Sequence, residues 1–493
     1  MKVYTLIQML LSATLSFAQD QNATMACSSI ENLLGPTKVQ SSGLQFEAGA
    51  TGAWNLANAQ LRPACIVFPL ETSDVQVAMK SIFKSNARYA VQAGGHSAME
   101  GWDNSQGGVL ILFSQMNNIS YNQETNTISM EPGLTWGEAT NAMEPFGVAP
   151  VGGRASAVGT GLLLGGGISF LSPAHGFGAD NIKCLDVVLV DGTLVVATVD
   201  NEYADLFRAL KGGGSRYGIV TKYELYAVHT GTSADKPWIG GTIVYPSSSV
   251  EAVINATAHY VQTVGDPRAV SLVNVIISGE ITAMAQVELF YNVTDTNTTT
   301  LPSSIFGELL SIPASSTNIT QLSYLEVLNT NPAGNNSGSG ETFGAGVFST
   351  AESTQVYLDA RAHWDNFTQA VAGTGAYFFT SLIFTPIPSS QVEAGRARGG
   401  NAIHAPLGGY VALNLGDQLT LGVAQPPPEA DEAKLLFLNQ LHRSPGFPFF
   451  MNECDKRQNV YETYGDYEFM KKTYMKYDPT RFIVEHMSGP PGL

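Results

Sequence analysis

The sequence predicts an α+β protein of two domains, and three observations support this fold class. The first half alternates short β-branched runs with helical patterns and glycine loops, and the composition changes near Val228. After that point, strand-like runs are separated by stretches rich in Ser, Thr and Asn. Such a pattern is typical of a second α+β domain built on an antiparallel sheet. The 493 residues also exceed the usual size of one domain.

The first domain is expected to begin with a helix and a strand. Residues 72–86 have helical periodicity, and Thr72 or Ser73 is a suitable N-cap. Residues 87–95 read as a strand that runs into a glycine turn.

Further strands and helices follow in the first half. Residues 126–147 predict a strand and then a helix, because Thr135 and Glu138 have capping-box spacing. Two β-branched runs flank Asp191-Gly192, which predicts a hairpin with a two-residue turn. A short helix that glycines terminate and an alternating strand complete the half, over residues 202–214 and 217–228.

The second half predicts an antiparallel sheet and a return to the first domain. Strand-like runs occupy residues 240–245, 285–291 and 375–384, and a proline-rich stretch follows. The C-terminal stretch is expected to form an aromatic strand and a helix that pack on the first domain. The expected division is therefore residues 27–230 and 440–493 for the first domain, and residues 231–439 for the second.

The N-terminus reads as a secretory signal. Lys2 precedes an apolar run, and small residues stand before Gln19, so residues 1–18 are expected to be removed. We therefore expect a secreted, N-glycosylated protein. Its sequons lie at Asn22, Asn118, Asn255, Asn292, Asn297, Asn318, Asn335 and Asn366, and those from Asn255 to Asn366 suggest exposed loops.

Cysteine usage and charge restrict the partners. Oxidising conditions favour a bridge between Cys27 and Cys65, although the sequence leaves the pairing of its four cysteines open. A formal charge of −17 argues against nucleic acid or an anionic membrane surface, and no later run has transmembrane length. A small molecule is the expected partner, and the oligomeric state stays open.

Glycine clusters predict a site for a large anionic cofactor. They comprise Gly94-Gly95, the loop from Gly159 to Gly167, and the run from Gly212 to Gly218. Glycines let successive N–H groups approach a phosphate. The dinucleotide fingerprint fails by one residue, the phosphate-binding P-loop is absent, and Met99 breaks a nucleophile elbow. No histidine or cysteine pair has metal-ligand spacing.

The ordered motifs resemble a known family. These are "GGHS", "VGTGLLLGGGISFLSPAHGFGADNI", "VVLVDGTLV", "ADLFRALKGGGSRYGIVTKYEL", "FMNECDKRQNVYETYG" and "KYDPTRF". Together they resemble the secreted FAD-linked oxidoreductases of the berberine-bridge-enzyme type, fungal branch. That family belongs to the vanillyl-alcohol-oxidase group, with a PCMH-type FAD-binding fold. The resemblance covers about residues 64–228 and the last fifty residues, and it is faint between them.

The resemblance assigns His96 to the covalent flavin link. In this family the histidine of the G-G-H-S turn bonds to the flavin 8α-methyl carbon, and such a tether raises the flavin's reduction potential. The alternative is a turn histidine that hydrogen bonds alone satisfy. Many relatives carry a second, cysteinyl link, but Ala155 occupies that position here, so we expect a single covalent link.

The resemblance also assigns cofactor-binding roles to residues of the glycine loops. Gly94, Gly95 and Ser97 would bind the pyrophosphate together with the second-loop residues Gly159, Gly165 and Gly166. Gly218 and Val220 would meet the flavin or adenine through main chain. The second loop is one residue shorter than the family pattern, and this departure bears on oxygen use because the loop lies near the oxygen-reactive side of the flavin in relatives.

The C-terminal motif supplies the candidate catalytic residues. Asn452 matches a family asparagine that faces the isoalloxazine, and Glu453 is a candidate general acid or base, because burial raises a carboxyl pKa. Alternatively, Glu453 starts a helix or forms a salt bridge. Tyr461 and Tyr464 are expected to pack, and His404 is expected to be a loop histidine rather than a pocket residue.

The expected function is oxidation of a small organic molecule, with hydride transfer to FAD and reoxidation by O₂. A secondary-metabolite intermediate is the expected substrate class, and the substrate carbon would have to lie about 3–3.5 Å from the flavin N5. Two alternatives remain open. One is a redox-neutral cyclase or isomerase that uses Glu453, and the other is an inactive secreted binding glycoprotein.

Overall fold

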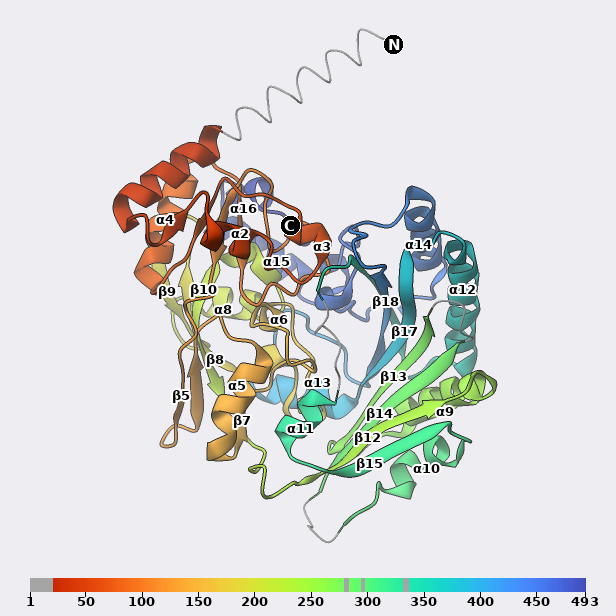
Figure 1. Cartoon of the computed structure of the whole chain (residues 1–493). Helices are drawn as coiled ribbons and strands as arrows, with labels where there is room; N and C mark the ends of the chain where they lie inside the picture. Colours follow the sequence, from red (N-terminus) through yellow and green to blue (C-terminus); the bar gives the residue numbers. More distant parts are fainter. Residues whose placement is uncertain (1–20, 279–282, 294–297, 331–336) are drawn as a thin grey trace.

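A computed structural model describes residues 21–278, 283–293, 298–330 and 337–493 of the chain (Figure 1). Its strands fall into two groups, one on each side of residue 230. Up to His229 the strands form a four-stranded sheet (β1-β2-β4-β3), a five-stranded sheet (β5-β6-β10-β8-β9) and a pair (β11-β7). Their bounds are β1 Val39–Gln40, β2 Cys65–Val67, β3 Tyr89–Gln92, β4 Val109–Leu112, β5 Ile119–Asn122, β6 Thr127–Met130, β7 Val148–Ala149, β8 Ile182–Val188, β9 Leu194–Ala197, β10 Ile219–Tyr226 and β11 Val228–His229.

The second group is one antiparallel sheet of seven strands in the order β15-β12-β14-β13-β17-β18-β16. This confirms the α+β class with an antiparallel sheet in the second half. The strands are β12 Trp238–Tyr245, β13 Ala269–Ser278, β14 Met284–Asn292, β15 Ser316–Leu322, β16 Glu341–Ser349, β17 Tyr377–Ile387 and β18 Tyr410–Leu419.

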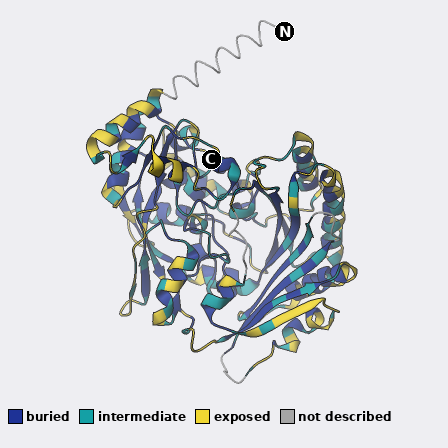
Figure 2. Ribbon diagram, in the orientation of Figure 1, coloured by how far each residue is buried: buried dark blue, intermediate teal, exposed yellow. Residues whose placement is uncertain are grey.

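Helices cover the outer face of this sheet, and Figure 2 shows its buried interior. The covering helices are α9 Val250–Thr263, α10 Ser303–Ser311, α12 Thr354–Ala372 and α14 Pro428–Gln440. Their apolar residues form one core with the alternate residues of the strands, such as Leu413 and Leu415 of β18. The remaining strand residues face the first half of the chain.

The other helices are mostly short. They are α2 Leu44–Ala50, α3 Leu56–Ala59, α4 Thr72–Ser85, α5 Trp136–Met143, α6 Gly161–Leu164, α7 Ser172–His175, α8 Ala204–Leu210, α11 Tyr324–Asn329, α13 Ser389–Ala397, α15 Tyr467–Tyr477 and α16 Phe482–His486. The 3-10 turns are η1 Glu144–Phe146, η2 Gly178–Asn181, η3 Gly214–Tyr217, η4 Ser247–Ser249, η5 Met451–Glu453 and η6 Tyr461–Thr463. No helix within the described ranges is long and apolar enough to cross a membrane.

Several local predictions are confirmed. Helix α5 has the expected capping box between Thr135 and Glu138, and the short helix and the alternating strand appear as α8 and β10. Residues 186–200 contain the expected hairpin, in which β8 and β9 pair antiparallel. The turn, however, is longer than predicted. Leu189 N donates to Thr193 O, so three residues form the loop, with Gly192 in the left-handed region at φ 85°.

Three predictions need correction. The N-cap of α4 is Glu71, because the helix already begins at Thr72, whose hydroxyl bonds to Thr221 instead. The aromatic segment 447–450 forms no strand, since its backbone joins no ladder and Phe449 N donates to Thr463 Oγ1. The helix of the C-terminal stretch is present as α15, and its buried residues belong to the same core as those of β8 and β10.

The third correction concerns the sequons, which are not confined to loops. Asn255 and Asn366 lie on helices α9 and α12, and Asn318 lies on the edge strand β15. Asn292 ends β14, whereas Asn297 and Asn335, like the predicted signal segment, lie outside the described residues. Asn118, Asn318 and Asn366 are exposed.

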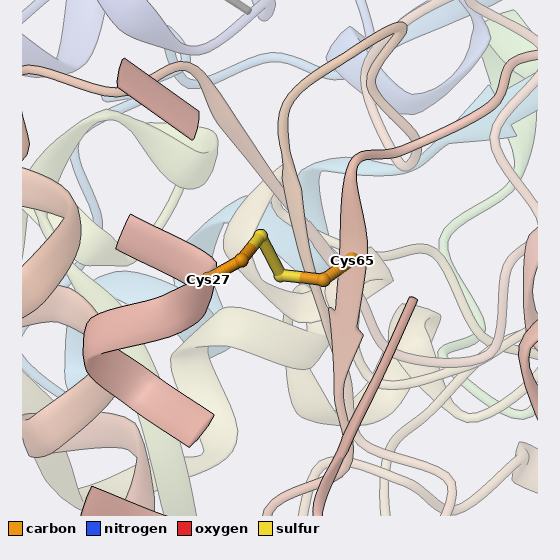
Figure 3. The surroundings of a disulfide bond; sticks show 2 residues. All are labelled: Cys27 and Cys65. Atoms are coloured by element: carbon orange, nitrogen blue, oxygen red, sulfur yellow. A yellow bond between two sulfur atoms is a disulfide. The ribbon is translucent and has the colours of Figure 1, made fainter. Parts of the chain in front are cut away.

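A disulfide joins Cys27 to Cys65, as the sequence suggested (Figure 3). Cys27 lies in a helical segment, residues 21–34, and Cys65 begins β2. The bridge therefore ties the N-terminal helix to the four-stranded sheet. The other two cysteines, Cys184 and Cys454, are free thiols.

Candidate functional site

A cavity of about 660 Å³ is lined by the glycine loops of the first half and by the inner face of the seven-stranded sheet. Backbone-rich segments from residues 93–97, 158–165 and 214–220 form one side. Side chains of β13, β14, β16, β17 and β18 form the other side, and Asn452 and Glu453 complete the wall. One half of the cavity is thus mostly backbone, and the other half is made of side chains.

The first two glycine loops touch each other directly. A Cβ atom on Gly94 would lie 2.7 Å from the Cα of Gly159, and a Cβ on Gly159 would lie 2.5 Å from the Gly94 nitrogen. Loop residue Gly95 also needs the left-handed region, at φ 66°. The close approach leaves backbone as the cavity wall here, and successive exposed N–H groups are what a pyrophosphate binds.

His96 follows this turn and lines the cavity. Its ring stacks on Trp54, with centroids 3.9 Å apart and an interplanar angle of 17°. The backbone supports this pair, because Trp54 N donates to Gly95 O at 2.8 Å. The imidazole is therefore held in a fixed plane at the cavity wall.

A buried carboxyl group, Asp103, lies beside the same turn. It accepts a hydrogen bond from Ser97 N at 3.1 Å and lines the cavity. Burial raises the pKa of Asp103 to about 7, against the opposing effect of that hydrogen bond. Asp103 can therefore hold a proton near neutral pH.

The 3-10 turn η5 places Asn452 and Glu453 at the cavity. Asn452 Nδ2 donates to Leu162 O at 3.0 Å, and the side chain packs where a Cβ of Gly165 would stand. The backbone oxygen of Glu453 accepts from Asn414 Nδ2 at 2.8 Å. Both halves of the cavity thus hold this turn in place.

The Glu453 carboxylate forms an ion pair with Arg154. The Arg154 guanidinium donates to Glu453 Oε1 at 2.8 Å and to Thr385 Oγ1 at 2.9 Å. Burial raises the pKa of Glu453, and the charge and hydrogen bond of Arg154 oppose the rise. The Glu453 carboxyl group therefore lines the cavity with its orientation fixed by Arg154.

The sheet side of the cavity is polar at selected positions. Asn414, Gly416 and Gln418 of β18 line it, because alternate residues of a strand point to one face. Glu341, the first residue of β16, pairs with Gln418 across the ladder and lines the cavity too. Burial, together with the charge of Asp417, raises the pKa of Glu341 to about 9.

The structure brings the sequence-predicted residues together at this cavity, with one exception. The lining includes Gly94, Gly95, His96, Ser97, Gly159, Gly165, Gly218, Val220, Asn452 and Glu453. Gly166 is not part of it, and a Cβ there would meet Ile403 Cδ1 at 2.7 Å. Gly166 therefore serves close packing beneath the loop.

The remaining residues that the sequence analysis named differ in whether they line the cavity. Ala155, the position that the family resemblance assigns to a second, cysteinyl link, lines the cavity, whereas Cys184 and Cys454 are not among the lining residues. His404 is a loop residue bonded to Asp466 at 2.6 Å. Tyr461 and Tyr464 are buried and pack edge to face.

Sequence reasoning missed Trp54, Asp103, Arg154 and Glu341. Arg154 had a weak signal, an arginine inside the glycine-rich run "GGRAS". Its partner lies 299 residues away, so no local pattern could have identified the pair. Within the described ranges, no cluster of three or more His, Cys, Asp and Glu residues could hold a metal ion.

Comparison with known proteins agrees with this geometry. Residues 63–198 match the family model described as FAD binding domain. An uncharacterized FAD-linked oxidoreductase from Arthroderma benhamiae is 34% identical over 226 residues, which are 45% of this chain and 44% of that protein. The bifunctional solanapyrone synthase of Alternaria solani is 35% identical over 204 residues, 41% of this chain and 38% of that protein. Each match spans less than half the length of the relative.

Solved structures extend the likeness over nearly the whole chain. A xylooligosaccharide oxidase from Myceliophthora thermophila, solved with xylobiose, has a TM-score of 0.75 at 19% identity. The superposition covers 95% of this chain and 100% of that protein. At this identity the likeness shows the fold, which is the two-part PCMH-type FAD-binding fold.

Proposed function

We propose that this chain, which belongs to the FAD-linked oxidoreductases of the berberine-bridge-enzyme-like type, oxidises a small organic molecule with FAD held covalently by His96. The observation that carries the proposal is the cavity that joins His96 and two touching glycine loops to a polar sheet face. FAD bound there would accept a hydride from the substrate and pass electrons to O₂, giving H₂O₂.

The residues present fit this cofactor. Backbone of Gly94 and Gly159 forms the cavity wall where side chains would otherwise stand, and successive N–H groups of such loops are what a pyrophosphate would bind. Ser97, Gly95 and Gly165 extend this backbone wall, and Gly218 and Val220 line its other end. We assign cofactor binding to these residues, with Gly166 supporting the loop from below.

His96 is the proposed covalent anchor. Its ring stacks on Trp54, so its orientation toward the cavity does not depend on the cofactor. A single histidyl link is proposed, because Ala155 offers no thiol.

Acid precipitation tests the cofactor and its anchor. Purified wild-type protein is expected to be yellow and to keep its colour in the acid pellet, whereas His96→Ala should release the flavin to the supernatant. His404→Ala is the matched control, since His404 lies outside the cavity lining and is hydrogen-bonded to Asp466. Colour that persists in the His96→Ala pellet would exclude His96 as the anchor, and folded protein without flavin would refute the enzyme assignment.

Glu453 is the proposed general acid or base, and Asn452 is proposed to contact the flavin. Glu453 lines the cavity with a raised pKa, and Arg154 holds its carboxylate at 2.8 Å. Oxidation of an alcohol or amine requires a group that takes the hydroxyl or ammonium proton. Glu453→Gln, which keeps the shape, should then lower kcat without releasing the flavin. Unchanged turnover in this variant would leave Glu453 a structural ion-pair residue.

A redox-neutral reaction is the second candidate, and the same carboxyl group favours it. A cavity-lining acid with a raised pKa can donate a proton to a substrate double bond, and one relative is named a synthase. A secondary metabolite is the substrate class we propose in both cases. Peroxide detection during turnover separates the two, because product without H₂O₂ indicates cyclisation or isomerisation.

We also propose that the protein is secreted and N-glycosylated. The Cys27–Cys65 bridge agrees with an oxidising compartment, and Asn118, Asn318 and Asn366 are exposed acceptors. Endoglycosidase treatment of protein from a eukaryotic culture medium should lower its mass.

A further inference from the structure

We propose that Glu341 forms a subsite for a protonated amine, so that the substrate of this enzyme carries a basic nitrogen on an apolar body. The inference rests on the proposed function and specifies its substrate class.

Glu341 is a buried acid that opens into the cavity. Its residue is 7% exposed, and it lines the cavity together with Phe343, which stands two positions along the same strand. No hydrogen bond from any described residue reaches its carboxyl oxygens, although its backbone is held by the Asn55 side chain through two hydrogen bonds. The backbone of Glu341 is thus fixed by the fold, and its carboxyl oxygens can bind a ligand in the cavity.

The charges around Glu341 favour a cation. Asp417 is the ionisable group whose charge acts on Glu341, and its effect is to oppose a second negative charge. Lys434 acts on Asp417 but forms its own ion pair with Asp455 at 2.8 Å. Among the described lining residues the only arginine or lysine is Arg154, which is paired with Glu453. A ligand cation would therefore supply the counter-charge that the ionised form of Glu341 lacks in these surroundings.

Aromatic residues at the cavity suit an alkylammonium ion. Trp54 and Phe343 line it, and so do Phe378 and Phe379 of β17. The Nε1 atom of Trp54 and the Oδ1 atom of Asp103, both at this cavity, are buried without a hydrogen-bond partner in the described structure. Ring faces attract cations, and their edges accommodate an apolar body.

Proton linkage gives the subsite a measurable signature. Free Glu341 is protonated at neutral pH, because burial raises its pKa to about 9. A bound ammonium ion stabilises the carboxylate, so binding releases a proton, and affinity rises about tenfold per pH unit while Glu341 stays protonated in the free protein. An alkylammonium ion keeps its own charge up to about pH 10.

The test is calorimetry of holoenzyme with phenethylamine and with its neutral counterpart 2-phenylethanol. We expect the dissociation constant of the amine to fall about tenfold per unit from pH 6 to pH 8, with release of one proton. The alcohol should show no such dependence. Glu341→Gln should weaken amine binding at pH 8 by about 30-fold or more and abolish its pH dependence, while alcohol binding stays unchanged.

Asp103→Asn is the matched control, since Asp103 is another buried cavity acid, with a pKa raised to about 7. It should leave the pH dependence intact. Loss of the dependence in this variant, or equal binding of amine and alcohol to wild type, would overturn the proposal. Tighter binding of the alcohol that Glu341→Gln abolishes would make Glu341 a neutral hydrogen-bond donor and overturn it too.

Two further readouts keep the test decisive. If Glu341→Gln does not fold, proton release by the wild type and by Asp103→Asn decides, measured in buffers of different ionisation enthalpy, and release that Asp103→Asn abolishes overturns the proposal. The visible spectrum of the same sample reports on the proposed function. Flavin-bearing protein that fails to prefer the amine overturns the subsite only, whereas flavin-free protein that binds the amine overturns the oxidoreductase function only.

Discussion

At the residue scale, the contact between Gly94 and Gly159 fixes the glycine-loop side of the cavity. The two residues lie 65 positions apart, and each occupies the space in which the other would need to place a side chain. The loops on either side can therefore approach only as backbone. This explains why glycine, rather than any small residue, stands at both positions.

Gly159→Ala is expected to disturb both folding and flavin binding. The added Cβ would lie 2.5 Å from the Gly94 nitrogen, so one loop must shift, at a cost of roughly 1–3 kcal/mol. We expect a lower melting temperature and less flavin per folded protein, measured by thermal denaturation and visible absorbance. Gly307→Ala on α10 is the control, because the nearest atom to its Cβ would be 3.8 Å away. Wild-type flavin content in Gly159→Ala would contradict the role of this contact.

The ion pair of Arg154 and Glu453 is the second residue-scale feature. Both side chains are largely buried, with 13% and 21% of their surface exposed. Removing the guanidinium leaves a buried carboxylate without a cation, which is more costly than removing both groups.

Arg154→Met should therefore lower the free energy of unfolding by about 3 kcal/mol, and adding Glu453→Gln should recover most of this loss. Urea denaturation at pH 8 of wild type, both single variants and the double variant measures the coupling. Equal destabilisation of Arg154→Met and the double variant would show that the pair contributes nothing as a pair.

The residue scale also shows where sequence reasoning stops. His96, Asn452 and the glycines could be proposed from short motifs, and the structure places most of them in the cavity lining. Trp54 and Glu341 could not be proposed, since each acts through a partner far along the chain, as in the bonds between Asn55 and Glu341, 286 positions apart. Only the fold makes such residues neighbours.

At the element scale, periodicity and turn signals predicted which helices and strands are present better than they predicted where each one begins and ends. Helix α5 carries its predicted capping box, because both partners lie within one turn. The hairpin of β8 and β9 forms, but its loop gains a residue, because Leu189 pairs with Thr193. Residues 447–450 have strand composition and no strand, since no neighbouring backbone pairs with them. Composition cannot reveal whether a pairing partner is present.

The disulfide between Cys27 and Cys65 is the element-scale feature with a measurable energy. It closes a span of 38 residues, and cross-links of this kind stabilise a fold by about 2–4 kcal/mol. Replacing both cysteines with alanine should lower the melting temperature, and reductant should then have no further effect. Cys184→Ser is the control for the reagent, because Cys184 is a free thiol. A melting temperature that reductant does not change in the wild type would contradict the tether.

At the scale of the whole molecule, several buried acids tie stability to pH. Burial raises the pKa of Asp103, Glu288 and Asp417 to about 7, and that of Glu341 to about 9. In the unfolded chain these groups lose their protons near pH 4. The folded protein therefore binds more protons than the unfolded chain above that pH, and its stability must fall as the pH rises.

We expect the melting temperature to decrease from pH 5 to pH 8. Acids with lowered pKa values do not oppose this trend, because the stability they add, as at Asp266 with a pKa of about 2, is lost only below about pH 4. His175, whose pKa burial lowers to about 4, opposes it only below about pH 6.5. Asp417→Asn should flatten the decrease between pH 5 and pH 7. A melting temperature that rises over this range would contradict the linkage.

The fold class could be predicted from the sequence, but the set of sheet residues that face the cavity could not. Strand runs in the second half predicted the antiparallel sheet, but the order β15-β12-β14-β13-β17-β18-β16 places β16, β17 and β18 together only through long connections. Which inward residues share the cavity depends on that order.

The alternation along β18 separates two kinds of change that this protein can tolerate. Asn414, Gly416 and Gln418 face the cavity, while Leu413 and Leu415 anchor the sheet to its helices. A library that randomises only the first set leaves the contacts of Leu413 and Leu415 with the helices in place. Within that set, Asn414 also holds the Glu453 turn and Gly416 has Ser381 Oγ 3.0 Å from its Cβ position, so Gln418 is the position to vary first. The glycine loops on the opposite wall allow no such variation. Substitutions that change the substrate are therefore expected on the sheet side of the cavity, at the alternate strand positions that face it.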